Sequence, residues 1–227
     1  MPLIELKNIS KLYGEGESRV AALENVSLTI NRGEFVAIAG TSGSGKSTLM
    51  NMLGCLDTQT SGEYRLNGAE VNSLSEKELT RIRNKEIGFI FQSFNLIPSL
   101  TARENVELPL IYRGLTQNVR RELALHALEK VSLKNRIDHL PGKMSGGQQQ
   151  RVAIARAIAA EPPMILADEP TGNLDSKSSA EVMRILYDLN SQGKTVIIIT
   201  HDDDIASKAA RTIRVSDGHI VSDVKLR

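Results

Sequence analysis

EFVAIAGTSGSGKSTLMNML, residues 34 to 53, places a glycine-rich loop between a strand pattern and a helix pattern. The loop, Gly40–Ser47, fits G-x-x-x-x-G-K-[ST], and the strand before it and the helix after it are the context that this motif requires. Backbone N–H groups of such a loop point inward and bind phosphate oxygens. Lys46 is expected to reach the β- and γ-phosphates, and Ser47 to offer its hydroxyl to Mg²⁺. A glycine-rich turn that arose by chance is a much weaker explanation.

A phosphate loop also needs a carboxylate for the metal ion. The run MILADE ends four apolar residues with Asp168, at the carboxyl end of a predicted strand, where ligands bind in parallel sheets. We expect Asp168 to hold Mg²⁺ through a water molecule. Glu169 follows directly and is the candidate general base for the attacking water. The alternative for this acidic pair is a solvated turn without function.

The apolar patterns outside the loop predict an α/β fold. The continuous runs FVAIA, MILA and VIII indicate a buried, mostly parallel sheet, and the alternating early strands indicate an antiparallel layer beside it. A two-residue hairpin is expected at Asp217-Gly218. Helices are predicted after Lys46 and at about 75–84, 101–110, 117–130, 145–160 and 176–191. Residues 1–227 are expected to form a single domain in which about 94–144 is an inserted helical subdomain.

Composition excludes several classes of protein. The chain has 28 Lys and Arg against 27 Asp and Glu, so the basic surplus of a protein that tracks along nucleic acid is missing. One cysteine, Cys55, rules out a disulfide framework and favours a reducing compartment. No apolar run approaches the ~18 residues of a membrane span. We therefore expect a soluble chain that binds no nucleic acid and reaches a membrane only through a partner.

A second helix start carries the most specific motif. In MSGGQ, residues 144–148, Ser145 is a good N-cap, and glycines occupy the next two positions, although glycine costs about 1 kcal/mol in a helix. Bare N–H groups at a helix N-terminus bind anions. With the phosphate loop, this stretch resembles the signature of the ATP-binding subunits of ABC transporters. Met144 stands where leucine is commoner in that family, a swap that conserves volume.

The resemblance covers nearly the whole chain and implies a P-loop ATPase that hydrolyses ATP with Mg²⁺. In that family two domains pair head to tail and enclose two ATP molecules. The resemblance thus implies that Ser145, Gly146, Gly147 and Gln148 bind the γ-phosphate held by the partner's loop. The predicted ATP-binding residues of the chain's own site are Tyr13, Gly40, Thr41, Ser42, Gly43, Ser44, Gly45, Lys46, Ser47 and Thr48.

Four further residues take roles from the same resemblance. Gln92 would contact Mg²⁺ or the attacking water and lie next to the membrane partner. Tyr13 would stack on adenine, although a half-buried core tyrosine is an alternative. Asp175, in GNLD, would link the two ATP sites across the dimer. His201 would contact the γ-phosphate and orient Glu169, so that Glu169, His201 and Gln92 form the catalytic set.

Longer matches narrow the branch. GCLDTQTSGEYRLNG, the segment from Gly88 to Gly114, SGGQQQRVAIARAIA and ILADEPTGNLDS are similar to the macrolide-export and lipoprotein-release group. This resemblance implies an integral-membrane permease partner, separate or fused, and a cytoplasmic chain on the inner face of the membrane. The chain stops at residue 227 without a hydrophobic tail, so it is expected to be a separate subunit or a fragment.

These motifs distinguish the chain from several other classes of phosphate-loop protein, but not from all of them. A mechanical ATPase of the cell-division type, which regulates wall hydrolases, shares every motif and stays open as an alternative. DNA-repair and chromosome ATPases contain long coiled coils, and no heptad run is present here. A translation factor of the superfamily would need two signatures in one chain. A metabolic kinase has no use for MSGGQ. The transported substrate and the organism are beyond the reach of the sequence.

Overall fold

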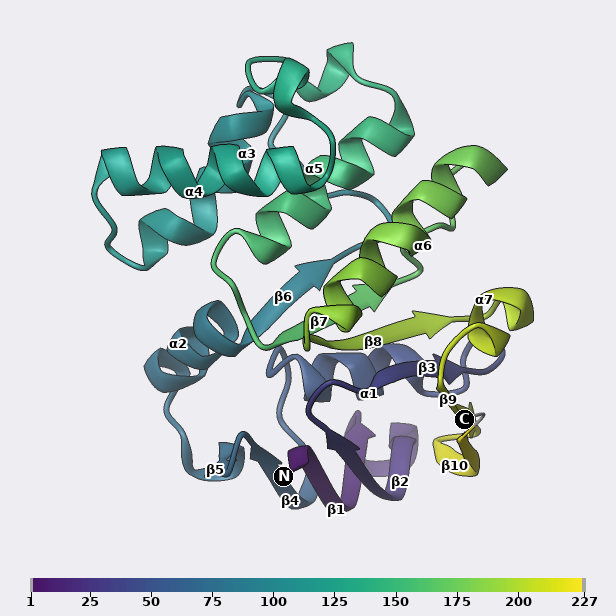
Figure 1. Ribbon diagram of the computed structural model, residues 1–227. Helices are drawn as coiled ribbons and strands as arrows, with labels where there is room; N and C mark the ends of the chain where they lie inside the picture. Colours follow the sequence, from purple (N-terminus) through teal and green to yellow (C-terminus); the bar gives the residue numbers. More distant parts are fainter. Residues whose placement is uncertain (1, 226–227) are drawn as a thin grey trace.

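The computed structural model describes residues 2–225, whose strands form two sheets (Figure 1). The larger sheet has the order β10-β9-β3-β8-β7-β6, and all its pairings are parallel except β9 with β10. Its strands are β3 (Phe35–Ala39), β6 (Ile87–Ile90), β7 (Met164–Asp168), β8 (Thr195–Thr200), β9 (Arg211–Ser216) and β10 (His219–Lys225). The predicted mostly parallel sheet is confirmed.

The smaller sheet is antiparallel, as predicted, with the order β2-β1-β4-β5. Its strands are β1 (Pro2–Tyr13), β2 (Val20–Asn31), β4 (Ser61–Leu66) and β5 (Ala69–Glu70). Figure 1 shows this sheet beneath the larger one, with α1 (Lys46–Leu53) between them. Buried side chains from both sheets and from α1 form one hydrophobic cluster. This packing holds the helix that follows the phosphate loop.

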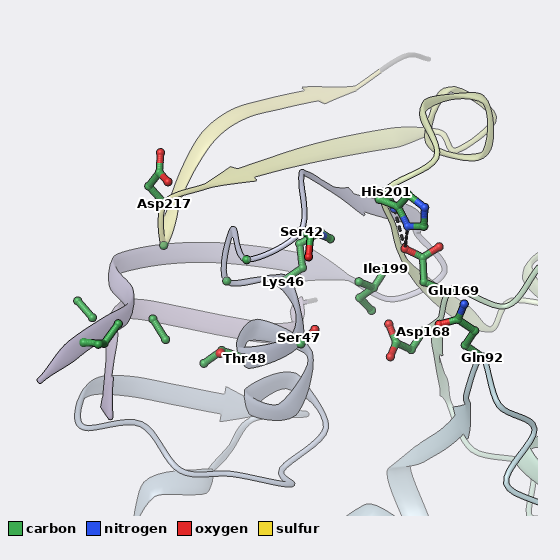
Figure 2. A pocket seen from close by; sticks show the side chains of 16 residues that line it. Ser42, Lys46, Ser47, Thr48, Gln92, Asp168, Glu169, Ile199, His201 and Asp217 are labelled. Atoms are coloured by element: carbon green, nitrogen blue, oxygen red, sulfur yellow. Dashed lines mark hydrogen bonds and ion pairs between the residues drawn. The ribbon is translucent and has the colours of Figure 1, made fainter. Parts of the chain in front are cut away.

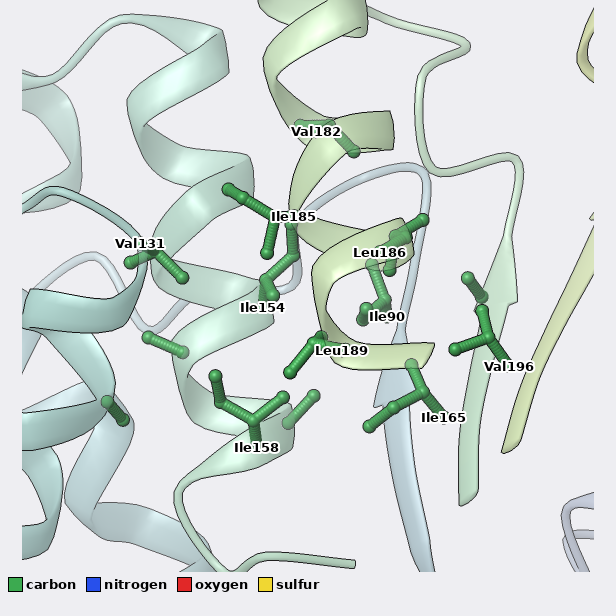
Figure 3. Close-up of a cluster of buried hydrophobic side chains, with 14 of the residues drawn as sticks. Ile90, Val131, Ile154, Ile158, Ile165, Val182, Ile185, Leu186, Leu189 and Val196 are labelled. Carbon is green, nitrogen blue, oxygen red and sulfur yellow. The ribbon is translucent and has the colours of Figure 1, made fainter. Parts of the chain in front are cut away.

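The opposite face of the larger sheet is covered by helices. These are α3 (Ala102–Tyr112), α4 (Gln117–Lys130), α5 (Gly146–Ile158) and α6 (Ser176–Ser191), while α2 (Glu76–Glu86) precedes β6. Figure 3 shows side chains of α5 and α6 packed against strand residues such as Ile165 and Val196. The cluster also includes residues of α3 and α4. Full burial of each such side chain stabilises the fold by about 1.5–3 kcal/mol.

Strand β8 explains why the core strands are apolar at every position. Val196 and Ile198 belong to the cluster beneath the helices, whereas Ile197 and Ile199 belong to the cluster around α1. Successive side chains of a strand point to opposite faces, and both faces of this sheet are covered. The sheet therefore presents its carboxyl ends to the site as a rigid platform.

Local signals placed most boundaries within a few residues. The hairpin is confirmed: Ser216 pairs with His219 across Asp217 and Gly218, whose φ angles are 48° and 78°. A capping box of Thr101 and Glu104 is present at the start of α3. One short helix, α7 (Asp203–Ser207), was not predicted, because five residues capped by Asp202 leave no measurable apolar period. None of the helices within residues 2–225 is long and apolar enough to cross a membrane.

Candidate active site

A cavity of about 600 Å³ opens at the carboxyl ends of β3, β7 and β8 (Figure 2). Its wall contains the phosphate loop, the first turn of α1, residues 20–22 of β2 and the turn between β9 and β10. The structure brings together ten predicted site residues in this wall: Ser42, Gly43, Gly45, Lys46, Ser47, Thr48, Gln92, Asp168, Glu169 and His201. Residues more than 150 positions apart in the sequence thus share one cavity.

The phosphate loop is shaped by close backbone packing. Gly45 has φ 102°, in the left-handed region, and a Cβ there would lie 2.6 Å from the carbonyl oxygen of Ala22. Only glycine fits both constraints. Gly45 also precedes the first residue of α1 and provides no side-chain cap. The N–H groups at the start of this helix are therefore directed into the cavity without competition from a capping side chain.

Lys46 supplies a buried positive charge. Its side chain donates to the Thr41 carbonyl oxygen over 2.6 Å and lies 3.5 Å from Ser44 Oγ. The pKa of Lys46 is lowered because its side chain is buried, and the nearby carboxylates of Glu169 and Asp168 offset only part of this effect. The ammonium group thus bonds to its own loop and has carboxylates within electrostatic range.

The acidic pair lies where the sequence placed it. Burial and the adjacent Glu169 raise the pKa of Asp168, and Lys46 partly offsets this rise. Glu169 has φ 43°, an uncommon conformation for a non-glycine residue. Such backbone strain costs on the order of 1–3 kcal/mol and is common at functional sites. The alternative of a fully solvated turn is wrong for this pair, because the side chain of Glu169 is only 14% exposed.

Residues at the end of β8 hold the Glu169 carboxylate. Oε1 accepts a hydrogen bond from the His201 backbone N–H over 2.8 Å and lies 2.5 Å from His201 Nδ1. Oε2 accepts one from the Thr200 hydroxyl over 3.0 Å. Figure 2 shows the His201 ring turned toward Glu169 at the cavity wall. Both carboxylate oxygens are therefore oriented by one strand end.

Gln92 enters the cavity from the other side, after β6. Asn173 donates from Nδ2 to the Gln92 carbonyl oxygen over 3.1 Å, and Gln92 Nε2 lies 3.5 Å from Asn173 Oδ1. A Cβ at Gly172 would lie 2.7 Å from Gln92 Nε2. The segment before α6 therefore confines this glutamine. Sequence reasoning did not predict a role for Asn173, because no local pattern marks the contact.

The donor set fits a magnesium nucleotide. The Ser47 hydroxyl, the Gln92 amide and the Asp168 carboxylate line one cavity, and hard oxygen donors suit Mg²⁺. Residues 2–225 contain no cluster of three His, Cys, Asp or Glu side chains that would hold a metal ion by itself. Mg²⁺ in phosphate-binding sites is commonly held by one or two protein groups together with substrate phosphates.

The second helix start lies outside this cavity. Ser145 is exposed and caps α5: its Oγ accepts from the Gln148 N–H over 3.3 Å, and Gln148 Oε1 accepts from the Ser145 N–H over 3.0 Å. The two glycines differ. A Cβ at Gly147 would lie 2.5 Å from Ser178 Oγ, whereas at Gly146 it would have no neighbour nearer than 3.7 Å. Gly147 is thus required for packing against α6 as well as predicted to bind phosphate.

The comparisons with known proteins decide the family. A family model described as "ABC transporter" matches residues 23–172. The chain belongs to the ABC transporter family. Membership implies ATP binding and hydrolysis. The predicted P-loop ABC ATPase fold is confirmed by a solved dimeric structure of the ATP-binding cassette MJ0796 bound to ADP and Pi. The MJ0796 cassette is 50% identical in sequence to this chain, and the two structures superpose with a TM-score of 0.91 over 99% of both chains.

Curated relatives place the cassette near the predicted group. The macrolide export ATP-binding/permease protein MacB of Marinobacter nauticus is 55% identical over 222 residues, which are 98% of this chain and 34% of that protein. The chain thus spans about a third of the length of these MacB relatives. The ABC transporter ATP-binding protein YvrO of Bacillus subtilis is 52% identical over 221 residues, 97% of this chain and 96% of that protein.

Tyr13 and Asp175, like the signature residues, were predicted from the ABC resemblance and lie outside the cavity wall. Tyr13 is 41% exposed, so a core role is wrong; its hydroxyl donates to Asp57 over 2.7 Å, and Lys11 Nζ lies 4.9 Å from its ring centroid. Its strand partner Val20 does line the cavity. Asp175 caps α6 by accepting from two backbone N–H groups. Adenine stacking by Tyr13 and contact across a dimer by Asp175 stay predictions.

Proposed function

We propose that two copies of this cassette pair head to tail and hydrolyse ATP between them, with each signature helix completing its partner's site. One observation carries the proposal: the cavity holds the phosphate loop and the carboxylates, whereas Ser145 stands exposed on a separate helix start. The dimeric state of the MJ0796 cassette bound to ADP and Pi supports the pairing of two copies. Each chain then carries half of two sites.

Glu169 acts as the general base in this proposal. Oε1 already accepts two contacts from His201, whereas Oε2 accepts only the Thr200 hydroxyl and keeps a lone pair for a water proton. The water oxygen bonds to the γ-phosphorus, the bond to the β–γ bridging oxygen breaks, and the proton passes to Glu169. His201 fixes the carboxylate, and its exposed ring is placed to contact the γ-phosphate.

Lys46 and the metal ligands bind and orient the triphosphate. Lys46 exchanges its bond to the neutral Thr41 carbonyl for bonds to phosphate oxygens. The buried ammonium group thereby gains a negatively charged partner, which offsets the cost of its burial. Ser47, Asp168 and Gln92 would hold Mg²⁺, which neutralises charge on the β- and γ-phosphates when bound. Tyr13 stacks on adenine, and Asp175 lies at the boundary between the two sites.

The cassette drives an integral-membrane permease from the inner face of the membrane, in macrolide export, lipoprotein release or mechanotransmission. A groove of about 480 Å³ beside α2 and α3 offers a docking surface for it, with apolar walls that include Phe89, Phe91 and the exposed Tyr112. Permease-containing MacB relatives favour export over the cell-division alternative.

Mixing two inactive variants tests the shared sites. Lys46→Ala removes the phosphate-loop cation, and Ser145→Arg blocks the signature. In a dimer of one copy of each variant, one site carries both substitutions. The other site combines an unchanged phosphate loop with an unchanged signature and is intact. The mixture is therefore expected to hydrolyse ATP although neither variant does so alone. A mixture as inactive as its components, with both variants folded, would mean that each signature serves its own chain.

A further inference from the structure

The loop between β6 and α3 is held by a partly buried arginine of the signature helix. Arg156, near the end of α5, donates from Nη2 to the Phe94 carbonyl oxygen over 2.8 Å and from Nη1 to the Asn95 carbonyl oxygen over 2.5 Å. Burial lowers the pKa of this guanidinium. No carboxylate of residues 2–225 forms an ion pair with it. Two neutral carbonyls therefore satisfy a charge that is costly to bury.

The two carbonyls belong to strained residues. Phe94 and Asn95 have φ 60° and 50°, in the left-handed region that non-glycine residues rarely adopt. Two successive residues in this conformation cost free energy and persist only when their surroundings impose them. Charge-assisted hydrogen bonds are about twice as strong as neutral ones. Arg156 is thus the group best placed to impose the shape of this loop.

The same short loop joins two parts of the proposed site. At one end Gln92 lines the cavity, where Asn173 holds it. Two residues later, the Phe94 ring lies 3.7 Å from the position that a Cβ would take at Gly146. One helix therefore holds the Phe94 carbonyl near its end and faces the Phe94 ring at its start.

We propose that Arg156 is a positioning residue that keeps Gln92 in the cavity by fixing the backbone of Phe94 and Asn95. It touches no reacting atom and acts through the loop. The proposal rests on the proposed function, in which Gln92 contacts Mg²⁺ or the attacking water. Loss of Arg156 should release Gln92, weaken the use of Mg²⁺ and slow hydrolysis. ATP binding without metal depends on Lys46 and should be unaffected.

Arg113 provides a matched control. Its Nη2 donates to the Asn84 and Lys85 carbonyl oxygens over 2.8 and 3.2 Å, and burial lowers its pKa in the same way. It therefore makes the same kind of contact, from a guanidinium to two successive carbonyls. It holds the end of α2, however, and does not line the cavity. Arg113→Met should cost stability without changing hydrolysis.

The experiment measures steady-state hydrolysis at varied Mg²⁺ concentration, with ATP affinity titrated in EDTA, on the full chain. Arg156→Met is expected to lower kcat about tenfold, the scale of a small misplacement at a reacting centre, and to raise the half-saturating Mg²⁺ concentration several-fold. Arg113→Met should leave both unchanged. The double variant Arg156→Met, Gln92→Ala should have the same kcat as Gln92→Ala alone, because both changes remove the same contact of Gln92 with the reacting centre.

Three results would overturn the assignment: unchanged Mg²⁺ dependence in folded Arg156→Met, a similar change in Arg113→Met, or full additivity with Gln92→Ala. If Arg156→Met does not fold, Arg156→Lys serves in both backgrounds, since a lysine ammonium cannot span both carbonyls as a planar guanidinium does. Failure of the wild-type chain to hydrolyse ATP with Mg²⁺ would instead contradict the proposed function.

Discussion

The starts of α1 and α5 are both glycine-rich helix N-termini, but they differ in capping and in exposure. The start of α1 has no side-chain cap and lies in a cavity with Lys46 and two carboxylates. The start of α5 is capped reciprocally by Ser145 and Gln148, and Ser145 is exposed. A helix start that is uncapped and enclosed with charges can bind a phosphate alone. We expect the capped and exposed start to bind a phosphate that another molecule presents.

The largest expected effect is on the chemical step, whose candidate base, Glu169, lies in the cavity with the start of α1 and not in α5. Glu169→Gln removes the proton acceptor while keeping the shape of the side chain, and should lower kcat by about 10²–10⁴-fold. ATP should still bind, and the dimer should accumulate because hydrolysis no longer reopens it. Single-turnover hydrolysis and size-exclusion chromatography measure both results. Normal turnover would remove Glu169 as the base.

Lys46→Ala tests the enclosed start. Removal of the buried cation should weaken ATP binding by about 100-fold, because the triphosphate loses a charge-assisted partner in a site shielded from water. Fluorescence titration of the monomer measures this affinity. Lys143→Ala, an exposed change close to α5, serves as the control and should bind ATP normally. Equal affinities of the two variants would contradict the assignment of the loop.

Ser145→Arg tests the exposed start. In a Glu169→Gln background it should abolish ATP-driven dimerisation, which light scattering detects, and leave monomer affinity for ATP within about twofold, since the cavity does not contain Ser145. Gly146→Asp should act alike, because a carboxylate at this terminus would repel phosphate. Loss of monomer binding with retained dimerisation would reverse the comparison between α1 and α5.

The two signature glycines separate packing from binding. Gly147→Ala should lower the free energy of unfolding by about 1–3 kcal/mol, because its Cβ would overlap Ser178. Gly146→Ala has room for its methyl group and should change stability by less than about 0.5 kcal/mol. Urea unfolding measures both. Equal losses would show that Ser178 moves aside without cost.

The smallest effect concerns charge near α1. The pKa of Asp168 is raised in the folded chain, so folding takes up protons between its ordinary and raised pKa values, and stability falls as pH rises through that window. Asp168→Asn should therefore raise Tm of the ligand-free chain by about 2–4 °C at neutral pH for each 1 kcal/mol of burial cost and repulsion that it relieves. The difference should vanish below the ordinary pKa. A pH-independent difference would mean that the charge is not its cause.

Local patterns in the sequence predicted most of the fold and several of the candidate site residues. The loop Gly40–Ser47, the apolar run ending at Asp168 and the N-cap Ser145 each depend on neighbours within a few positions. Such signals arise from backbone preferences and burial periods that act along the chain, so they can be read without the structure. The position of the acidic pair at the end of β7 was predictable for this reason.

Only the tertiary structure decided which residues meet. Three hydrogen bonds of the site join segments that are 31 to 81 positions apart in the sequence. They link Asn173 to Gln92, Arg156 to Phe94 and Thr200 to Glu169. No local preference marks such pairs, because each contact joins segments that are distant in the sequence. The different duties of Gly146 and Gly147 likewise follow from where α6 lies. Contacts of this kind depend on how helices and strands pack, and that packing is a property of the whole chain.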